Sequence, residues 1–310
     1  MKNILEIINR NAEDFPREFI KECENEYIEE LNELSDLISD NLNIKIVSLA
    51  GPSGSGKTTT AHILCDKLKE MGRNTTVLSL DDFYLPNELL PVLPDGSKDI
   101  ESVNSLDLEL LRKCFKEIIK TGKTCLPRFD FKTKTRFLND NPIDISHNNG
   151  IVIVEGLHAL NPHITELVPT ENLYKIYISV NCPIKKKNGD TLLSSRQIRL
   201  IRRALRDRIF RNTDINTTLS LWNGVVEGER KYLYCYKETA DFQLVTLHPY
   251  EVCVYKRFFL QLEESVKKSA PCYDYFIGTV NALKKLNSID IELVPENSLI
   301  REFIGNGHYN

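Results

Sequence analysis

The sequence predicts an α/β fold in which a parallel sheet is flanked by helices on both faces. Three observations support this class: residues 44–58 join an apolar strand to a glycine-rich loop, a helical stretch follows through Gly72, and apolar β-branched runs recur later. Nearly continuous apolar strands are typical of a parallel sheet that is covered on both sides. With 310 residues and 41% hydrophobic content, the chain can bury a substantial core.

The glycine-rich loop has the pattern Gly51-x-x-x-x-Gly56-Lys57-Thr58. Backbone N–H groups can wrap a phosphate chain only where side chains do not block the approach, and glycines meet that need. The following helix adds its positive dipole end, the lysine reaches the outer phosphates, and the threonine hydroxyl can hold Mg²⁺. A flexible Gly/Ser turn would explain neither flanking element. We therefore predict a P-loop NTPase that binds ATP and Mg²⁺ through Gly51, Pro52, Ser53, Gly54, Ser55, Gly56, Lys57, Thr58 and Thr59.

The remaining elements follow from hydrophobic periodicity. Residues 1–43 are charged and lack glycine, which predicts one or two amphipathic helices that lead into the first strand. Residues 124–137 alternate in part and contain Pro127, which predicts a small hairpin projecting from the sheet. Further strands are predicted at 75–80, 151–154, 174–180 and 242–245, and helices at 106–121, 194–211, 215–237, 250–268 and 274–286.

No internal repeat or low-complexity linker divides the chain. We expect a helical lead-in at residues 1–43, one catalytic domain at 44–305, and a C-terminal tail at 306–310.

Acidic residues stand at the ends of two predicted strands, where ligands bind in open α/β sheets. Asp81 and Asp82 follow the second strand, and Glu155 ends the third. There an aspartate can accept a proton from an attacking hydroxyl, and a buried glutamate near a cation is a candidate Mg²⁺ ligand. A helix-capping aspartate and a hydrogen-bonded structural glutamate are the alternatives. His158 is more often packed than catalytic and receives no role.

Residues 196–211 contain seven arginines and one acid, Asp207. On a helix one stripe is apolar, and the other side carries Arg199, Arg202, Arg203 and Arg206. This density of like charge predicts either a solvated basic face or an anion nearby, and arginines over a transferring phosphoryl group stabilise the transition state. A nucleic-acid site would need interleaved aromatic residues, which are lacking here except for Phe210.

Composition narrows the choice of partners. A formal net charge of −4 gives no overall reason to bind nucleic acid or an acidic membrane. The eight cysteines show no zinc-ligand spacing, which argues for free thiols in a reducing compartment. The N-terminus lacks a signal-peptide core, and no later window approaches a membrane-spanning length. We expect a cytoplasmic protein with a small-molecule substrate; a homo-oligomer stays open.

Five segments, in this order, resemble uridine kinases of the phosphoribulokinase and uridine kinase superfamily. They are the P-loop, Leu-Asp-Asp-Phe-Tyr at 80–84, Pro-Arg-Phe-Asp-Phe at 127–131 with Arg136, Val-Glu-Gly-Leu-His-Ala-Leu-Asn-Pro at 154–162, and Arg-Leu-Ile-Arg-Arg-Ala-Leu-Arg-Asp at 199–207. The likeness covers residues 44–305. The tail at 293–305 resembles the bacterial branch that carries an N-terminal TGS-type module, for which residues 1–43 are too short.

The resemblance implies a role for each matching position. Asp81, rather than Asp82, becomes the general base on a nucleoside 5′-hydroxyl, while Thr58 and Glu155 become the Mg²⁺ ligands. Lys57, Arg203 and Arg206 become catalytic, the two arginines lying on a helical, arginine-rich lid whose Arg211 contacts the nucleotide. The implied acceptor pocket contains Tyr84, Asn104, Phe129, Asp130, Lys134 and Arg136, with Asp107 nearby.

The chain departs from this family at the acceptor pocket. Uridine and cytidine kinases place a tyrosine and a histidine where this sequence has Phe129 and Lys134, and an acidic ribose-binding residue where the best register gives Asn104. A site that lacks polar partners for its substrate discriminates weakly. Uridine specificity is therefore the weakest implication of the resemblance.

Three functions remain in competition. The first is an ATP- and Mg²⁺-dependent kinase of uridine or a related nucleoside. The second keeps phosphoryl transfer but uses another hydroxylated acceptor, such as a sugar phosphate held by Lys132, Lys134 and Arg136. The third is a regulator that binds ATP without efficient catalysis, although such a protein would not need an acceptor base such as Asp81.

Overall fold

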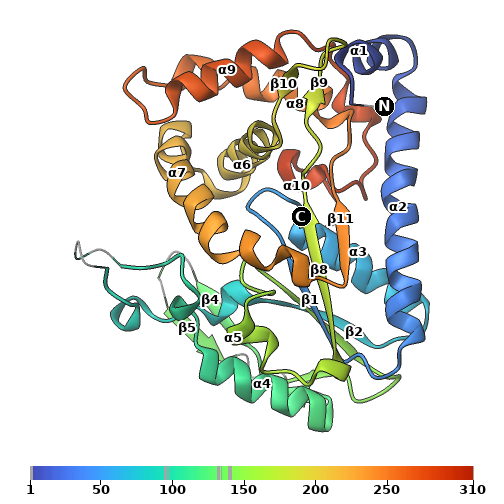
Figure 1. The fold of residues 1–310 in the computed structure, drawn as a ribbon, viewed down its shortest axis with the longest axis vertical. Helices are drawn as coiled ribbons and strands as arrows, with labels where there is room; N and C mark the ends of the chain where they lie inside the picture. Colours follow the sequence, from blue (N-terminus) through green and yellow to red (C-terminus); the bar gives the residue numbers. More distant parts are fainter. Residues whose placement is uncertain are drawn as a thin grey trace.

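A five-stranded parallel sheet lies at the centre of the computed structural model, which describes residues 3–93, 96, 98–130, 133, 135–138 and 142–309 (Figure 1). The strands are β1 (Ile46–Ala50), β2 (Thr75–Ser79), β7 (Ile151–Glu155), β8 (Leu173–Ser179) and β11 (Phe242–Val245), in the order β11-β8-β1-β7-β2. All neighbouring pairs are parallel. The predicted sheet class is confirmed, and the strand bounds agree within two residues.

Two hydrophobic clusters lie on opposite faces of this sheet. Alternation along β1 sends Val47 and Leu49 into one cluster and Ile46 and Ala50 into the other. The first cluster is covered by α2 (Pro16–Asp40) and α3 (Lys57–Glu70), and the second by α4 (Leu108–Thr121) and the single turn α5 (Pro162–Thr165). Every residue of β1 and β7 is buried, and apart from Ser48 and Glu155 these two strands are apolar, as expected for central strands covered on both faces.

The N-terminal segment forms two helices, α1 (Leu5–Asp14) and α2, separated at Phe15. Pro16 occupies the first position of α2, where its missing N–H removes no helical hydrogen bond. Buried residues of α2, among them Leu31 and Leu34, belong to the same cluster as β1. This segment is therefore packed into the core of the sheet domain.

The C-terminal half contributes five more helices among the described residues. They are α6 (Ser195–Arg211), α7 (Ile215–Tyr232), α8 (Glu251–Leu260), α9 (Tyr273–Leu283) and the short α10 (Arg301–Ile304). Three predicted helices were too long: α7 is followed by the 3₁₀ segment Tyr234–Thr239, the helix predicted over 250–268 ends at Leu260, and the one predicted over 274–286 ends at Leu283. Figure 1 shows α6 between α7 and α10, above the sheet.

Short antiparallel pairs complete the fold. The predicted hairpin is present as β4 (Pro127–Asp130) and β5 (Thr135–Leu138), with Phe129 opposite Arg136. The sequence did not predict the pairs β3 (Lys123–Thr124) with β6 (Ile143–Asp144) and β9 (Ile184–Lys185) with β10 (Thr191–Leu193). Within the described ranges, no helix is both long enough and apolar enough to cross a membrane.

Candidate active site

The P-loop runs from the end of β1 to the start of α3. Gly54 and Gly56 have φ angles of 73° and 84°, which side-chain-bearing residues rarely adopt. A Cβ on Gly51 would lie 2.6 Å from Ile178 Cγ1, and one on Gly56 would lie 2.8 Å from Leu299 Cδ1. Backbone conformation and close packing therefore both require glycine here.

Donors in this loop are available for an anion. The amides of Gly54, Gly56, Lys57 and Thr58 donate no hydrogen bond within the part of the chain that the structure describes. In the same region the buried Ser55 hydroxyl has no hydrogen-bond partner. These groups fit a phosphate chain, because buried donors are otherwise satisfied and a helix N-terminus attracts anions.

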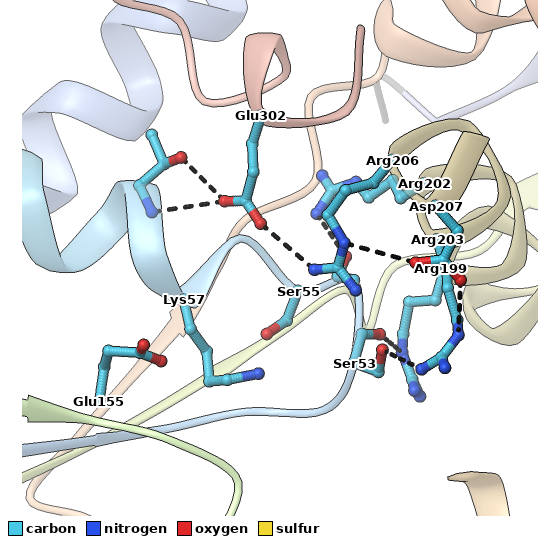
Figure 2. Close-up of polar contacts among 12 residues, drawn as sticks. Ser53, Ser55, Lys57, Glu155, Arg199, Arg202, Arg203, Arg206, Asp207 and Glu302 are labelled. Atoms are coloured by element: carbon cyan, nitrogen blue, oxygen red, sulfur yellow. Dashed lines mark hydrogen bonds and ion pairs between the residues drawn. The ribbon is translucent and has the colours of Figure 1, made fainter. Parts of the chain in front are cut away.

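The Lys57 side chain extends from the start of α3 toward Ser53 (Figure 2). Its Nζ donates to Pro52 O at 3.3 Å. Burial lowers the pKa of Lys57, while the carboxylates of Glu155 and Asp81 oppose that shift. The lysine and both predicted carboxylates thus belong to one electrostatic cluster. A polyanion bound in the loop would favour the charged lysine.

Glu155 and Asp81 differ in their surroundings. Glu155 is buried and accepts a hydrogen bond of 2.7 Å from Ser79 Oγ, and burial together with the Asp81 charge raises the pKa of Glu155 to about 7. Asp81 is exposed just beyond β2, and its backbone N–H donates to Ser79 Oγ at 3.4 Å. Oxygen ligands from Thr58 and Glu155 suit Mg²⁺. No cluster of three His, Cys, Asp or Glu side chains able to hold a metal is present in the described ranges.

Asp82 has a different contact from its neighbour. Its carboxylate accepts a hydrogen bond of 3.1 Å from the Phe129 amide and so ties the end of β2 to the hairpin β4/β5. The carboxylate of Asp81, by contrast, makes no hydrogen bond or ion pair with any residue that the structure describes. This difference supports the choice of Asp81 over Asp82 as the candidate base.

Two of the arginines on α6 are buried structural residues. Arg199 pairs with Glu229 and donates to Ser53 O at 2.9 Å. Arg202 pairs with Glu251 at 2.6 Å and donates to Gly54 O at 3.1 Å. For these two positions the solvated basic face, one of the two alternatives drawn from the sequence, is wrong, because both side chains are buried and pair with acidic residues of α7 and α8.

Three other arginines of α6 lie around the carboxylate of Asp207. Arg203 donates to Ser53 Oγ at 2.8 Å, and Arg206 Nη1 lies 3.7 Å from Glu302 Oε1 (Figure 2). Both are within 4.0 Å of the Asp207 carboxylate, as is the more exposed Arg211. Asp207 therefore partly balances the charge of the arginines that the sequence assigns to the lid.

The predicted acceptor residues are only partly brought together. The rings of Tyr84 and Phe129 lie 5.9 Å apart, centroid to centroid. Arg136 forms an ion pair of 2.8 Å with Asp107, and Asp130 ends β4 beside them on the same hairpin. Asn104 is exposed on the 3₁₀ turn Val103–Ser105. Lys134 and Lys132 fall outside the described residues.

Sequence reasoning missed Glu101, which is half-buried near this pocket. Burial raises the pKa of its carboxyl, and the Arg203 guanidinium nearby opposes the shift; Asp81 also acts on it. Glu101 Oε2 would lie 3.1 Å from a Cβ on Gly228, so the Glu101 side chain packs directly against α7. Glu101 stands three residues before Asn104. Aligning the acidic ribose-binding residue of the family with Glu101 instead of Asn104 would have found it from the sequence.

A P-loop on a parallel sheet, with carboxylates at the strand ends and arginines beside the loop, is typical of a P-loop phosphotransferase. The family model for the phosphoribulokinase / uridine kinase family matches residues 46–252. The chain belongs to this family, and it is a phosphotransferase that acts on a hydroxyl group. Residues 253–310 lie beyond the matched region.

The chain is also similar to individual curated proteins and to solved structures. A uridine kinase from Ureaplasma parvum serovar 3 is 28% identical over 183 residues, which cover 58% of this chain and 77% of that protein. One from Lactobacillus helveticus is 27% identical over 186 residues, covering 59% and 76%. Among solved structures, a putative fructose transport system kinase from Silicibacter sp. TM1040 is 18% identical, with a TM-score of 0.47 and coverage of 69% of this chain and 98% of that one.

Proposed function

We propose that the protein is an ATP- and Mg²⁺-dependent kinase that transfers the γ-phosphoryl group to the 5′-hydroxyl of uridine or a related nucleoside. The observation that carries this proposal is the aromatic pair Tyr84 and Phe129, next to the open carboxylate of Asp81. Aromatic faces suit a planar base. The carboxylate of Glu101 suits a hydroxyl donor such as a ribose diol and disfavours an anionic acceptor.

The chain's own residues supply positioning and charge. The P-loop amides and Lys57 hold the phosphates of the donor nucleotide, and Thr58 with Glu155 would hold Mg²⁺, which neutralises phosphate charge when bound. Asp81 orients the acceptor hydroxyl and takes its proton. Arg203 and Arg206 stabilise the charge that develops on the transferred group.

One observation favours a second candidate, a kinase of a phosphorylated sugar. Nη1 of Arg136 is buried without a hydrogen-bond partner among the described residues, although the same guanidinium pairs with Asp107. An acceptor phosphate would satisfy that donor. The neighbouring carboxylates of Asp107 and Glu101 oppose such an anion, so we place this candidate second.

A product assay separates these candidates. The protein is incubated with ATP, Mg²⁺ and a mixed pool of nucleosides and sugar phosphates, and new phosphate esters are identified by mass spectrometry. We expect a nucleoside monophosphate, and no product from 5′-deoxyuridine, which lacks the reacting hydroxyl. A sugar bisphosphate instead would refute the nucleoside assignment, while ATP binding without any product would favour the regulator.

A further inference from the structure

The C-terminal helix α10 brings a carboxylate to the P-loop helix. Glu302 Oε2 accepts hydrogen bonds from Thr59 Oγ1 at 2.8 Å and from the Thr59 amide at 3.3 Å. Its other oxygen, Oε1, lies 3.7 Å from Nη1 of Arg206 on α6 (Figure 2). One acidic side chain therefore joins the start of α3 to an arginine of the candidate lid.

Both partners of Glu302 are groups that a phosphate chain would use. Thr59 is the third residue of α3, and its amide is among the first four of the helix, which have no partner within the helix. Together with the neighbouring P-loop amides, such donors form the anion site of the fold. Nε of Arg206 is buried without a hydrogen-bond partner in the part of the chain described, so this arginine has spare capacity for an anion.

The backbone that carries Glu302 is held firmly. Arg301, the preceding residue, donates to the carbonyls of Val294 at 2.6 Å and Ile291 at 3.1 Å. Leu299 packs against the P-loop, in contact with the space beside Gly56. With the segment anchored in this way, release of Thr59 and Arg206 would take place by rotation of the Glu302 side chain and not by movement of the backbone.

We propose that Glu302 sets the affinity for the nucleotide. Its carboxylate occupies the N-terminal end of α3 and holds Arg206 until the phosphates displace it, and the released arginine then binds the phosphates. This inference rests on one part of the proposed function, the binding of the donor nucleotide at the P-loop. It assigns a role to a residue outside the region matched by the family model.

The physical basis is competition between two anions for the same donors. A carboxylate at a helix N-terminus is favourable in the empty protein, but next to a bound triphosphate the same charge is repelled. A substitution that removes the charge of Glu302 but keeps its shape should therefore lower the stability of the nucleotide-free protein slightly and increase the affinity for the nucleotide. A residue that merely anchored Arg206 for the nucleotide would give the opposite change in affinity.

The first test measures ATP and ADP binding by isothermal titration calorimetry, which needs no acceptor and no turnover. We expect Glu302→Gln to bind ATP about 3- to 30-fold more tightly than the wild type and to unfold at a slightly lower temperature without nucleotide. Glu296→Gln is the matched control, because Glu296 is an exposed carboxylate of the same segment. Equal tightening in both variants, or unchanged or weaker binding in Glu302→Gln, would overturn the proposal.

A double-mutant cycle tests the transfer of Arg206. In the wild type the arginine must leave Glu302 before it can bind phosphate, so Arg206→Gln should cost less ATP affinity there than in the Glu302→Gln background. An equal cost in both backgrounds would overturn the coupling. Loss of ATP binding in the wild type itself would refute the proposed function along with this role, whereas ATP binding without product would refute only the kinase assignment.

Discussion

Arg202 and Glu251 form an ion pair in which both side chains are fully buried, with Nη2 and Oε2 2.6 Å apart. The same guanidinium donates to the carbonyls of Gly54 and Thr246, and it lies over the ring of Phe303 at 5.0 Å. The pair thus joins α6, α8 and the C-terminal segment to the P-loop. The shape of the phosphate site therefore depends on a contact between residues that are far apart in the chain.

Breaking this pair should destabilise the protein strongly. Arg202→Met leaves the Glu251 carboxylate buried without its partner, and we expect a loss of about 3 to 5 kcal/mol in the free energy of unfolding. Arg208→Met is the matched control, since Arg208 is exposed on the same helix, and should change stability by less than about 0.5 kcal/mol. Denaturant unfolding measures both; similar losses in the two variants would contradict a special role for the pair.

Asp81→Asn should abolish most of the turnover while leaving ATP binding nearly intact. Loss of a general base costs about 10²- to 10⁴-fold in rate. Asp82→Asn should reduce turnover much less, because Asp82 holds the Phe129 amide, a contact that asparagine can keep. Steady-state kinetics with the acceptor found in the product assay, alongside ATP titration, give the comparison. Unchanged turnover in Asp81→Asn would remove Asp81 from the mechanism.

Glu155→Gln should weaken the response to Mg²⁺. The neutral amide keeps the hydrogen bond from Ser79 but loses the charge that a hard cation prefers. We expect the Mg²⁺ concentration for half-maximal turnover to rise about tenfold, with ATP binding in EDTA little changed. Glu166→Gln, at an exposed carboxylate beyond the same strand, serves as the control. An unaltered Mg²⁺ response would exclude Glu155 from the metal site.

His158 should make the protein sensitive to acid. Burial lowers the pKa of His158 to about 4, and this effect outweighs the opposing influence of the Glu101 backbone and the Asp99 charge. The unfolded chain takes up this proton near pH 6.5 and the folded chain near pH 4. Stability from the neutral imidazole is therefore complete above pH 6.5 and falls as the pH drops toward 4, by up to about 3 kcal/mol.

Unfolding at pH 7.5 and at pH 4.5 tests this sensitivity. His158→Leu should show a smaller difference between the two values than the wild type, whatever the substitution costs in packing. The same change at the exposed His163 should leave the difference as it is. A difference in His158→Leu as large as that of the wild type would assign the acid sensitivity to other groups.

Local sequence patterns determined the sheet, the P-loop, the hairpin and the carboxylates at the strand ends. Such features depend on residues close in the chain: glycines at fixed spacing, alternating or continuous apolar runs, and acids that directly follow a strand. The lengths of α7 and α8 were overestimated, because each helix is followed by a 3₁₀ segment that the sequence did not separate from it. Element ends are set by tertiary packing as well as by local preference.

Tertiary structure alone separated the arginines of α6 into two kinds. In the sequence Arg199, Arg202, Arg203 and Arg206 share one side of a helix, yet the first two are neutralised by acids on α7 and α8. The acidic residues Glu101 and Glu302 likewise lie at the site although they are distant from the P-loop in the sequence. A periodic pattern predicts which face of a helix carries a side chain. The charged partner of that side chain depends on how segments distant in the sequence pack against the helix.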